Sequence, residues 1–349
     1  LFSSTLNFNS KRTLYSYLSH LDMKKLITLL LLLTTSAFAY DQSALMHAFN
    51  SVVMIRGYQE NGSLGYGSGV IVGDNQIVTN CHVLRGTKKP WVSQGDQTYS
   101  IVSVKSNPWH DLCLIGTHGM SRTPVPLGTS QLRKNSEVVG IGHSHGAPVP
   151  LTIGGLIIAT YPNDNGNLIL SSAKFRLGAS GSGLFNMQGE LVGINTFKTT
   201  GYGSYFAVPV EWLKDLISQK EFDEFPVKGK ALWEEDEDKK PYYLRIAIPK
   251  AKEEWNGVEK LANEWVKKEP NNTEAWYELG YAYLSLNKMD AAKEAFKKSN
   301  ECDKKNIDPI FELAKIAKND DPYQAEKYLE QLNQIDLDKA TELKEIFNK

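Results

Sequence analysis

The sequence is poor in cysteine and has no paired metal-binding motif. Its 349 residues include three cysteines, Cys81, Cys113 and Cys302, and three cysteines cannot all pair within one chain. Neither a CxxC nor an HExxH pattern occurs. These absences argue against a structural zinc site, and we expect neither a metal nor another cofactor.

A surplus of charge of either sign is also missing. The formal net charge is −1 at pH 7, so nothing in the composition points to nucleic acid as a partner. The hydrophobic content of 41% is enough to build real cores. A chain of this length has room for roughly two or three domains.

The apolar run Leu26–Leu33 is too short to span a membrane. It lies within residues 23–39, which start at Met23 with two lysines and end in Ala-Phe-Ala, the layout of a secretory signal peptide. No cysteine follows, which argues against a lipid anchor. We expect residues 1–22 to be an untranslated upstream extension, Tyr40 to be the mature N-terminus, and the mature protein to be soluble, exported and without a stable membrane anchor.

Short β-type segments dominate residues 43–210. They are rich in Val, Ile and Thr, are separated by Gly or Asn/Asp clusters, and cover 51–57, 67–73, 76–80, 111–116, 137–142, 167–172 and 190–196. Many short strands without intervening helices indicate an all-β barrel or sandwich. A helix over 209–219 is expected to close this unit, so we assign residues 43–220 to one domain.

The hydrophobic period changes after residues 221–241, a charged segment that we interpret as a linker between two mobile units. The following region contains the tetratricopeptide signature W-x2-L-G-x2-Y…A-x3-F. Its positions are Trp276, Leu279, Gly280, Tyr283, Ala292 and Phe296. Residues 242–349 are therefore predicted to form an all-α array of roughly two to three helical hairpins.

The predicted array offers a surface for a protein partner. In such arrays the signature positions pack the core, and the first helix of each hairpin lines a concave face. On the clear repeat, Glu278, Tyr281, Ala282 and Ser285 are expected on that face. A protein substrate or partner would bind there.

The stretch RLGASGSGLF, residues 176–185, holds two serines among glycines. Taken alone it is typical of a flexible turn. Upstream, however, His82 directly follows a β segment, where we expect a loop, and Asp111 stands at the head of an apolar strand. Each is unremarkable by itself, but the chain order His, Asp, then glycine-framed Ser is that of serine hydrolases built on paired β-barrels.

The two serines differ in the residues that precede them. Acyl transfer needs backbone N–H groups aimed at the developing oxyanion, from the nucleophile and from the residue two before it, where glycine best takes the required turn. Ser180 has Gly178 at that position, whereas Ser182 has Ser180. We predict Ser180 as nucleophile, His82 and Asp111 as its partners, and the N–H groups of Gly178 and Ser180 as the oxyanion hole.

Five motifs within residues 45–215 together resemble the trypsin-like serine peptidases: GSGVIV, TNCHVL, HDLCLI, GASGSGLFN and GELVGIN…FAVP. The resemblance is greatest to bacterial HtrA-type and glutamyl-endopeptidase-type members. It implies two six-stranded antiparallel barrels, with His82 and Asp111 on the first and Ser180 on the second. It also implies a periplasmic or extracellular serine endopeptidase; the alternative is a catalytically inactive binding protein of the same fold.

The same resemblance implies roles around the substrate. Thr196 aligns where a hydroxyl commonly supports the aspartate, and the strand Asn195–Lys198, including Thr196 and Phe197, would pair with an extended substrate. The charged-specificity determinants of relatives are replaced here by Asn195 and Lys174. A small or medium apolar residue is therefore expected before the scissile bond, or an acidic residue if Lys174 reaches the pocket. Ala179 replaces the acidic residue that some relatives use for activation by a new N-terminus.

Cys81 and Cys113 flank the predicted histidine and aspartate. If those two residues make contact, the cysteines lie close enough to form a disulfide in an oxidising compartment; two buried reduced cysteines are the equal alternative. Cys302 is expected to be packed in a helix. In GHSHG, His143 and His145 alternate as metal ligands can, but no carboxylate or cysteine accompanies them, so we predict no metal site there.

Overall fold

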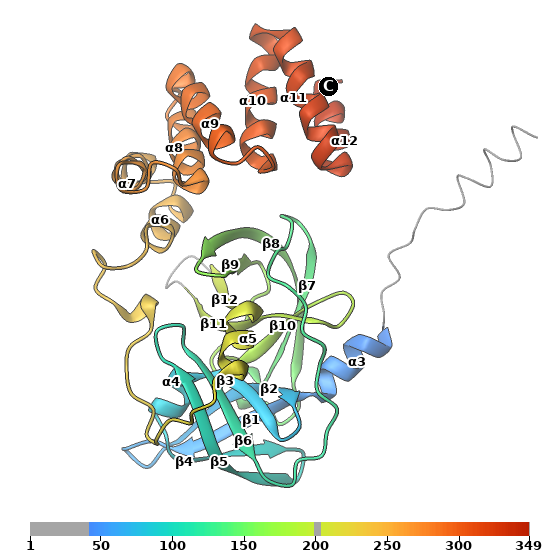
Figure 1. Cartoon of the computed structure of the whole chain (residues 1–349), viewed down its shortest axis with the longest axis vertical. Coiled ribbons are helices and arrows are strands. Elements are labelled where there is room, and N and C mark those ends of the chain that lie inside the picture. Colours follow the sequence, from blue (N-terminus) through green and yellow to red (C-terminus); the bar gives the residue numbers. More distant parts are fainter. Residues whose placement is uncertain (1–41, 199–203, 349) are drawn as a thin grey trace, which may run out of the picture. The chain divides into compact units, whose positions relative to one another are not determined.

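The computed structural model describes residues 42–198 and 204–348 (Figure 1). The predicted upstream extension and the signal peptide at 23–39 lie outside the described residues. Among the helices described, none combines the length and the apolar character needed to cross a membrane.

Six antiparallel strands close into a first barrel in the order β1-β2-β3-β6-β5-β4. They are β1 (Val52–Tyr58), β2 (Leu64–Gly73), β3 (Gln76–Asn80), β4 (Lys88–Gln94), β5 (Gln97–Asn107) and β6 (Leu112–Thr117). Helix α3 (Gln42–Asn50) precedes the barrel, and the short helix α4 (Cys81–Arg85) follows β3. Fully buried β-branched side chains such as Val53, Ile55 and Ile77 fill the interior, because alternate residues of each strand point inward.

A second barrel follows in the order β10-β11-β12-β9-β8-β7. Its strands are β7 (Glu137–Gly142), β8 (Leu151–Asn163), β9 (Gly166–Ser171), β10 (Ser182–Asn186), β11 (Leu191–Lys198) and β12 (Tyr205–Pro209). The 3-10 turn η1 (Ser144–Gly146) joins β7 to β8, and helix α5 (Val210–Ser218) ends the unit. The predicted double barrel is confirmed, and each β segment predicted from composition overlaps a strand.

The segment 221–241, predicted to be a linker, is mostly exposed but is held against the first barrel at a few points. The N–H of Asp223 donates to the Val104 carbonyl at 2.8 Å, and Val227, Ala231 and Leu232 are buried. A short 3-10 turn, η2 (Leu232–Glu234), forms near its end. These few apolar anchors are hidden among the charged residues of the sequence, and the assignment of 221–241 as a linker stays a prediction.

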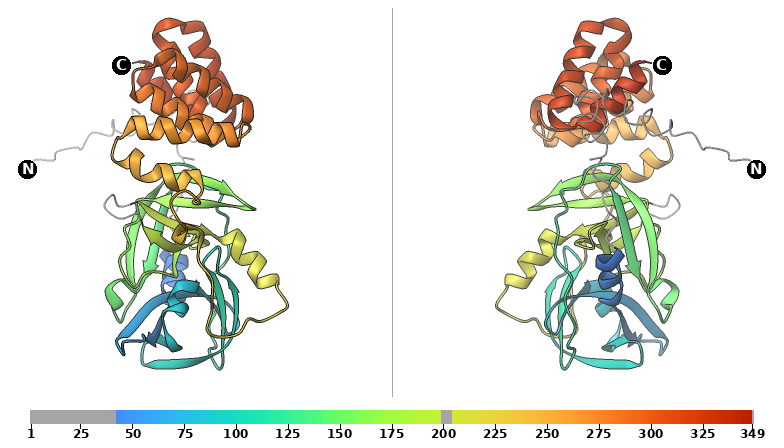
Figure 2. Two further views of the ribbon diagram at one scale, coloured as in Figure 1. Left: turned by 90° about the vertical axis from the view of Figure 1, so that its left-hand side faces the viewer. Right: turned by 90° about the vertical axis from the view of Figure 1, so that its right-hand side faces the viewer.

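Helices α6 to α12 form the predicted all-α array (Figure 2). They are α6 (Tyr242–Ala251), α7 (Trp255–Lys268), α8 (Thr273–Ser285), α9 (Met289–Cys302), α10 (Ile307–Asp320), α11 (Pro322–Ile335) and α12 (Leu337–Phe347). In the clear repeat, Phe296 of α9 is fully buried. It lies against Gly280 of α8, where an added Cβ would be 2.7 Å from the Phe296 ring. The spacing of the signature positions therefore reflects how the two helices pack.

The expected concave-face residues are largely used inside the array. Glu278 is 1% exposed, and its carboxylate pairs with the Lys250 ammonium of α6 at 2.6 Å. Ala282 is fully buried, and the Tyr281 ring lies against Trp255. The prediction of an open binding surface is wrong for Glu278 and Ala282, because the preceding helix pair covers them.

Candidate active site

His82 and Asp111 meet where β3 ends and β6 begins. The antiparallel register of these strands sets Asn80 opposite Leu112. The residues just beyond this pair, which include His82 on one side and Asp111 on the other, are therefore brought together. The His82 backbone N–H donates to Asp111 Oδ1 at 2.7 Å, and the ring Nδ1 contacts Oδ2. His82 lies in the first turn of α4 rather than in the predicted loop.

The Asp111 carboxyl is fully buried. Burial raises its pKa above the ordinary value, and the hydrogen bonds from His82 oppose that shift. Because both carboxylate oxygens are used by His82, Asp111 holds the imidazole in one orientation. Nδ1 faces the carboxylate, so Nε2 is left for other chemistry.

Ser180 lies on a tight turn before β10, between two glycines with left-handed backbone. Gly178 has φ +92° and Gly181 has φ +84°. A Cβ at Gly178 would lie 2.6 Å from the His143 carbonyl oxygen, and one at Gly181 only 2.2 Å from that of Ser68. Both positions therefore require glycine on two grounds, backbone conformation and space.

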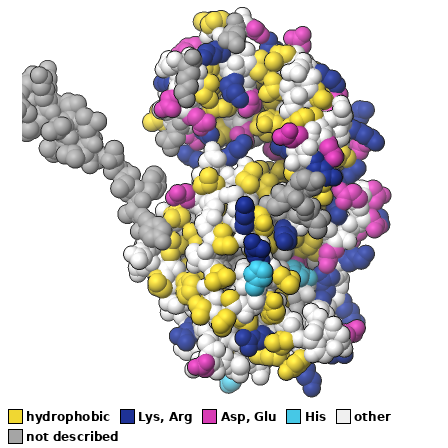
Figure 3. All heavy atoms as spheres, turned by 180° about the vertical axis from the view of Figure 1, so that it is seen from behind, with side chains coloured by type: hydrophobic (Ala, Val, Ile, Leu, Met, Phe, Trp, Pro, Cys, Tyr) yellow, Lys and Arg dark blue, Asp and Glu magenta, His cyan; other side chains and the backbone are white. Residues whose placement is uncertain are grey.

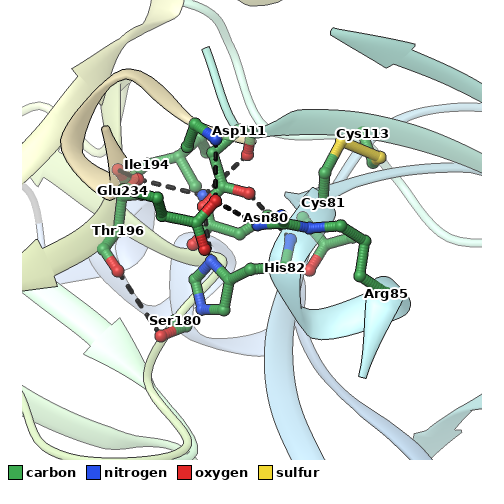
Figure 4. Close-up of polar contacts among 12 residues, drawn as sticks. Asn80, Cys81, His82, Arg85, Asp111, Cys113, Ser180, Ile194, Thr196 and Glu234 are labelled. Carbon is green, nitrogen blue, oxygen red and sulfur yellow. Dashed lines mark hydrogen bonds and ion pairs between the residues drawn. A yellow bond between two sulfur atoms is a disulfide. The ribbon is translucent and has the colours of Figure 1, made fainter. Parts of the chain in front are cut away.

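The His82 ring lies between Asp111 and Ser180 (Figure 4). The Ser180 hydroxyl donates to the Thr196 carbonyl at 3.5 Å, a long and weak contact that a rotation about χ1 can exchange. Ser182, the other candidate, is 1% exposed and accepts a hydrogen bond from Asn195 Nδ2 at 3.0 Å. Of the two serines, Ser180 is the one that borders the histidine.

Internal hydrogen bonds orient the peptide groups of the turn. The Leu177 carbonyl accepts an N–H from η1 at 2.6 Å, and the Ala179 carbonyl accepts one from β10 at 2.9 Å. In a trans peptide the C=O and the following N–H point in opposite directions. The N–H groups of Gly178 and Ser180 therefore face away from these internal partners, as an oxyanion hole requires.

Strand β11 continues past the end of its neighbour β10. The pairing of β10 with β11 stops at Ser182 and Asn195, whereas β12 stays paired as far as Lys198. On the Ser180 side, β10 thus leaves the backbone edge of residues 196–198 uncovered. An extended peptide can add to such an edge.

With this geometry in place, comparison with known proteins identifies the domain. Residues 67–194 match the family model described as trypsin-like peptidase domain, and residues 273–306 match a tetratricopeptide repeat. The chain carries a trypsin-like peptidase domain. The fold, the motif order and the matched family agree.

Similar proteins are named serine proteases. Serine protease HTRA1 of Xenopus laevis is 30% identical over 224 residues, 60% of this chain and 46% of the relative. A Hahella chejuensis protein described as "probable periplasmic serine endoprotease DegP-like" is 32% identical over 184 residues, 50% of this chain and 39% of the relative. The chain thus spans less than half the length of these two relatives. A solved serine endoprotease from Yersinia pestis is 28% identical and has a TM-score of 0.45, covering 51% of this chain and 66% of that chain.

Within the peptidase domain, Thr196 does not contact the Asp111 carboxylate as expected. Its hydroxyl donates to the Ile194 carbonyl at 2.7 Å and accepts from Asn80 Nδ2 at 3.0 Å. The same Nδ2 donates to the Asp111 carbonyl at 3.0 Å. Asn80 is therefore the link between Thr196 and the Asp111 backbone. Sequence reasoning missed it, although a polar residue at a buried strand end beside His82 is a signal.

The two specificity positions of the peptidase domain differ in burial. Asn195 is 1% exposed, and its Nδ2 donates to Ser182 Oγ at 3.0 Å and to the Gly183 carbonyl at 3.2 Å. The Asn195 side chain is thus turned into the barrel, and the predicted pairing of the strand Asn195–Lys198 with an extended substrate stays a prediction. Lys174 is exposed.

Cys81 and Cys113 form a disulfide, with their Cα atoms 5.0 Å apart. The bridge ties α4, which carries His82, to β6, which follows Asp111. Cys302 is exposed at the end of α9 rather than packed, because its position lies on the outer face of that helix.

The GHSHG segment of the peptidase domain divides its two histidines. His143 is buried, whereas His145, on η1, is exposed. In the part of the chain that the structure describes, no group of three or more His, Cys, Asp or Glu side chains is arranged to hold a metal ion.

Proposed function

We propose that this protein is a serine endopeptidase that uses Ser180, His82 and Asp111. The Ser180 hydroxyl oxygen attacks the scissile carbonyl while its proton passes to His82 Nε2. The imidazolium then gives that proton to the leaving amine, which breaks the peptide bond and leaves an acyl-enzyme. Water, deprotonated by His82, attacks the ester and releases the acid. The observation that carries the proposal is the His82 ring, held by buried Asp111 and bordered by Ser180.

In this scheme an oxyanion hole stabilises the negative charge that develops on the substrate carbonyl oxygen. The N–H groups of Gly178 and Ser180 would donate to it, since their peptide groups are oriented by internal hydrogen bonds. This arrangement does not need rearrangement at the moment of attack. It supports an active enzyme over an inactive scaffold of the same fold.

The substrate is proposed to be an extended polypeptide. Its backbone would pair with the open edge of residues 196–198 by β-augmentation. A small or medium apolar residue would precede the scissile bond, because the position at which acidic-specific relatives carry a histidine is the inward-turned Asn195, and the position at which Lys/Arg-specific relatives carry an aspartate is Lys174. Efficient cleavage after arginine in a profiled peptide library would contradict this specificity.

We further propose that the protein is exported and that its array binds protein segments. The predicted signal peptide and the periplasmic description of DegP-like relatives support export, as does the disulfide. On the face shown in Figure 3, acidic and basic side chains are intermixed, so a partner would be recognised by local chemistry rather than by a field of one sign. A protein partner captured by the full chain but not by one lacking residues 242–349 would support this role.

The nucleophile is tested by two neighbouring serines. Ser180→Ala should abolish labelling by a fluorophosphonate probe and lower kcat by about 10⁶-fold, a loss reported for removal of such a nucleophile. Ser182→Ala should keep labelling and most of the activity, since it removes only a buried hydrogen bond to Asn195. Labelling that survives in Ser180→Ala but disappears in Ser182→Ala would show that Ser182, and not Ser180, is the nucleophile. Absence of labelling and hydrolysis in the unmodified protein would favour the inactive scaffold.

A further inference from the structure

Three aromatic rings stack beside the open edge of β11. The Phe197 ring lies between that of Phe206, 4.7 Å away centroid to centroid, and that of Trp233, 4.5 Å away. Both faces of Phe197 are therefore covered from within the chain. Phe206 is fully buried, whereas Phe197 and Trp233 are half-buried, and Trp233 is the outermost ring of the stack.

Trp233 comes from η2, outside the barrels, and its neighbours hold it in place. Leu232 is fully buried, and its N–H donates to the Trp109 carbonyl at 3.0 Å. The Glu234 carboxylate receives the Ala231 N–H and an Arg85 N–H, each at 2.7 Å. Arg85 belongs to α4, the helix of His82, and Figure 4 shows Glu234 beside that histidine. The segment is thus anchored at the rim of the active site.

A cavity of ≈ 170 Å³ lies next to Trp233. Its lining comes from β11, from η2 and the segment after it, and from α6: Phe197, Lys198, Trp233, Glu237, Lys240, Leu244 and Ile248. Of the three charged groups in this lining, Lys240 Nζ pairs with Glu237 at 2.8 Å, and Lys198 is exposed at the end of β11. The other walls are aromatic and aliphatic. Apolar cavities of about 150 Å³ hold a molecule the size of benzene.

The position of the cavity relative to a bound peptide follows from strand geometry. If the residue before the scissile bond pairs near Thr196, antiparallel pairing sets the second residue opposite Phe197, on the same face as its ring. Side chains alternate along a strand, so the fourth residue shares that face about 7 Å farther on. Because the cavity adjoins Lys198, at the outer end of the edge, it lies where the fourth side chain arrives.

We propose that this cavity binds the side chain of the fourth residue before the scissile bond, and that Trp233 is a specificity-determining residue. The side chain it takes is apolar and of medium size, such as Leu, Ile or Phe. The inference rests on the proposed peptidase function. It makes the segment after the barrels, together with α6, part of the substrate-binding cleft.

The test uses the full chain and peptides that differ only at the fourth residue, Leu, Ala or Asp. The unmodified protein should cleave the Leu peptide with a kcat/KM about tenfold or more above the Ala peptide, a discrimination that an apolar pocket can provide. Trp233→Ala should remove most of this preference, and Trp233→Phe should retain it. Ile248→Trp, which fills the cavity from α6, should reject Leu at this position while Ala is still accepted.

Trp91→Ala is the matched control, because Trp91 is also a half-buried tryptophan with one aromatic neighbour, Tyr58, 5.6 Å away on the first barrel. It should leave the Leu-to-Ala ratio unchanged. An equal loss on all three peptides in Trp233→Ala would show a merely structural role, and a change in preference at the second residue instead would show the wrong position; either result overturns the inference.

The same experiment separates the inference from the function on which it rests. If the unmodified protein cleaves peptides without preference at the fourth residue, the cavity proposal fails and the peptidase proposal stands. If it neither cleaves any peptide nor reacts with a fluorophosphonate, both fail.

Discussion

At the residue scale, buried His143 is linked to the turn that carries Ser180 by a chain of hydrogen bonds. Its Nδ1 lies 2.7 Å from the Ala147 carbonyl oxygen, and its backbone N–H donates to Ser68 Oγ at 2.9 Å. Ser68 Oγ in turn donates to the Gly178 carbonyl at 2.8 Å. Burial lowers the pKa of His143, although the hydrogen bond to Ala147 opposes that shift.

This lowered pKa predicts acid sensitivity. Below the ordinary histidine pKa of about 6.5, the unfolded chain binds a proton that the folded state resists, so the free energy of unfolding falls as the pH falls. Urea midpoints between pH 7.5 and 5.5 should therefore decrease more steeply for the unmodified protein than for His143→Gln. The free energy of unfolding can fall by at most about 1.4 kcal/mol for each unit by which the His143 pKa differs between the unfolded and the folded state.

Exposed His145 supplies the control, since His145→Gln should keep the steep dependence. His110, whose pKa is also lowered by burial, acts in the same direction and should remain in both variants. Equal pH dependence in the unmodified protein and His143→Gln would contradict the prediction.

At the element scale, α8 and α9 approach closely only because residue 280 is glycine. A Cβ there would be 2.7 Å from the Phe296 ring. Gly280→Ala should lower the free energy of unfolding by about 1 kcal/mol, because overpacking costs about 1–3 kcal/mol and exceeds the gain in helix propensity of about 1 kcal/mol. Urea unfolding followed by the helical circular dichroism signal measures this change.

Gly257 of α7 is the matched helical glycine. Its Cβ would meet Pro249 at an ordinary 3.6 Å, so Gly257→Ala should leave stability unchanged or raise it by up to about 1 kcal/mol. If Gly280→Ala is as stable as Gly257→Ala, the close contact between α8 and α9 does not require glycine at residue 280.

At the scale of the whole molecule, the disulfide suits a protein that works in an oxidising compartment. The Cys81–Cys113 bridge spans a sequence separation of 32 residues, and closing a loop of that size stabilises a fold by about 3–4 kcal/mol. Reduction should therefore lower the thermal midpoint of the protein. It should also lower peptidase activity, because the bridge joins the elements that position His82 and Asp111.

The exposed cysteine separates this effect from general thiol chemistry. Cys302→Ser should have the midpoint of the unmodified protein, and Cys81→Ser with Cys113→Ser should match the reduced form. An unchanged midpoint after reduction, with all three thiols titrated, would mean that the bridge contributes no stability.

The strands that composition predicted are those with buried, β-branched faces, such as β3 and β7. The other five strands were missed. Strands β4, β5 and β8 are largely exposed or half-buried and carry Lys, Gln, Ser or Gly among the apolar residues, and β10 and β12 are only five residues long. The barrels could still be predicted, since the motif order resembles one family. The helical array was predicted from the tetratricopeptide signature, whose positions are those at which the two helices of a hairpin pack together.

The sequence alone determined which residues could carry the chemistry, because histidine, aspartate and a glycine-framed serine in that order admit few folds. It also indicated the oxyanion turn, because Gly178 stands two residues before Ser180. The tertiary structure alone decided that Asn80 links Thr196 to Asp111, that Asn195 points inward, and that Trp233 reaches Phe197. These contacts join residues distant in sequence, and their directions depend on strand register and on where a connecting segment packs, which no local pattern encodes.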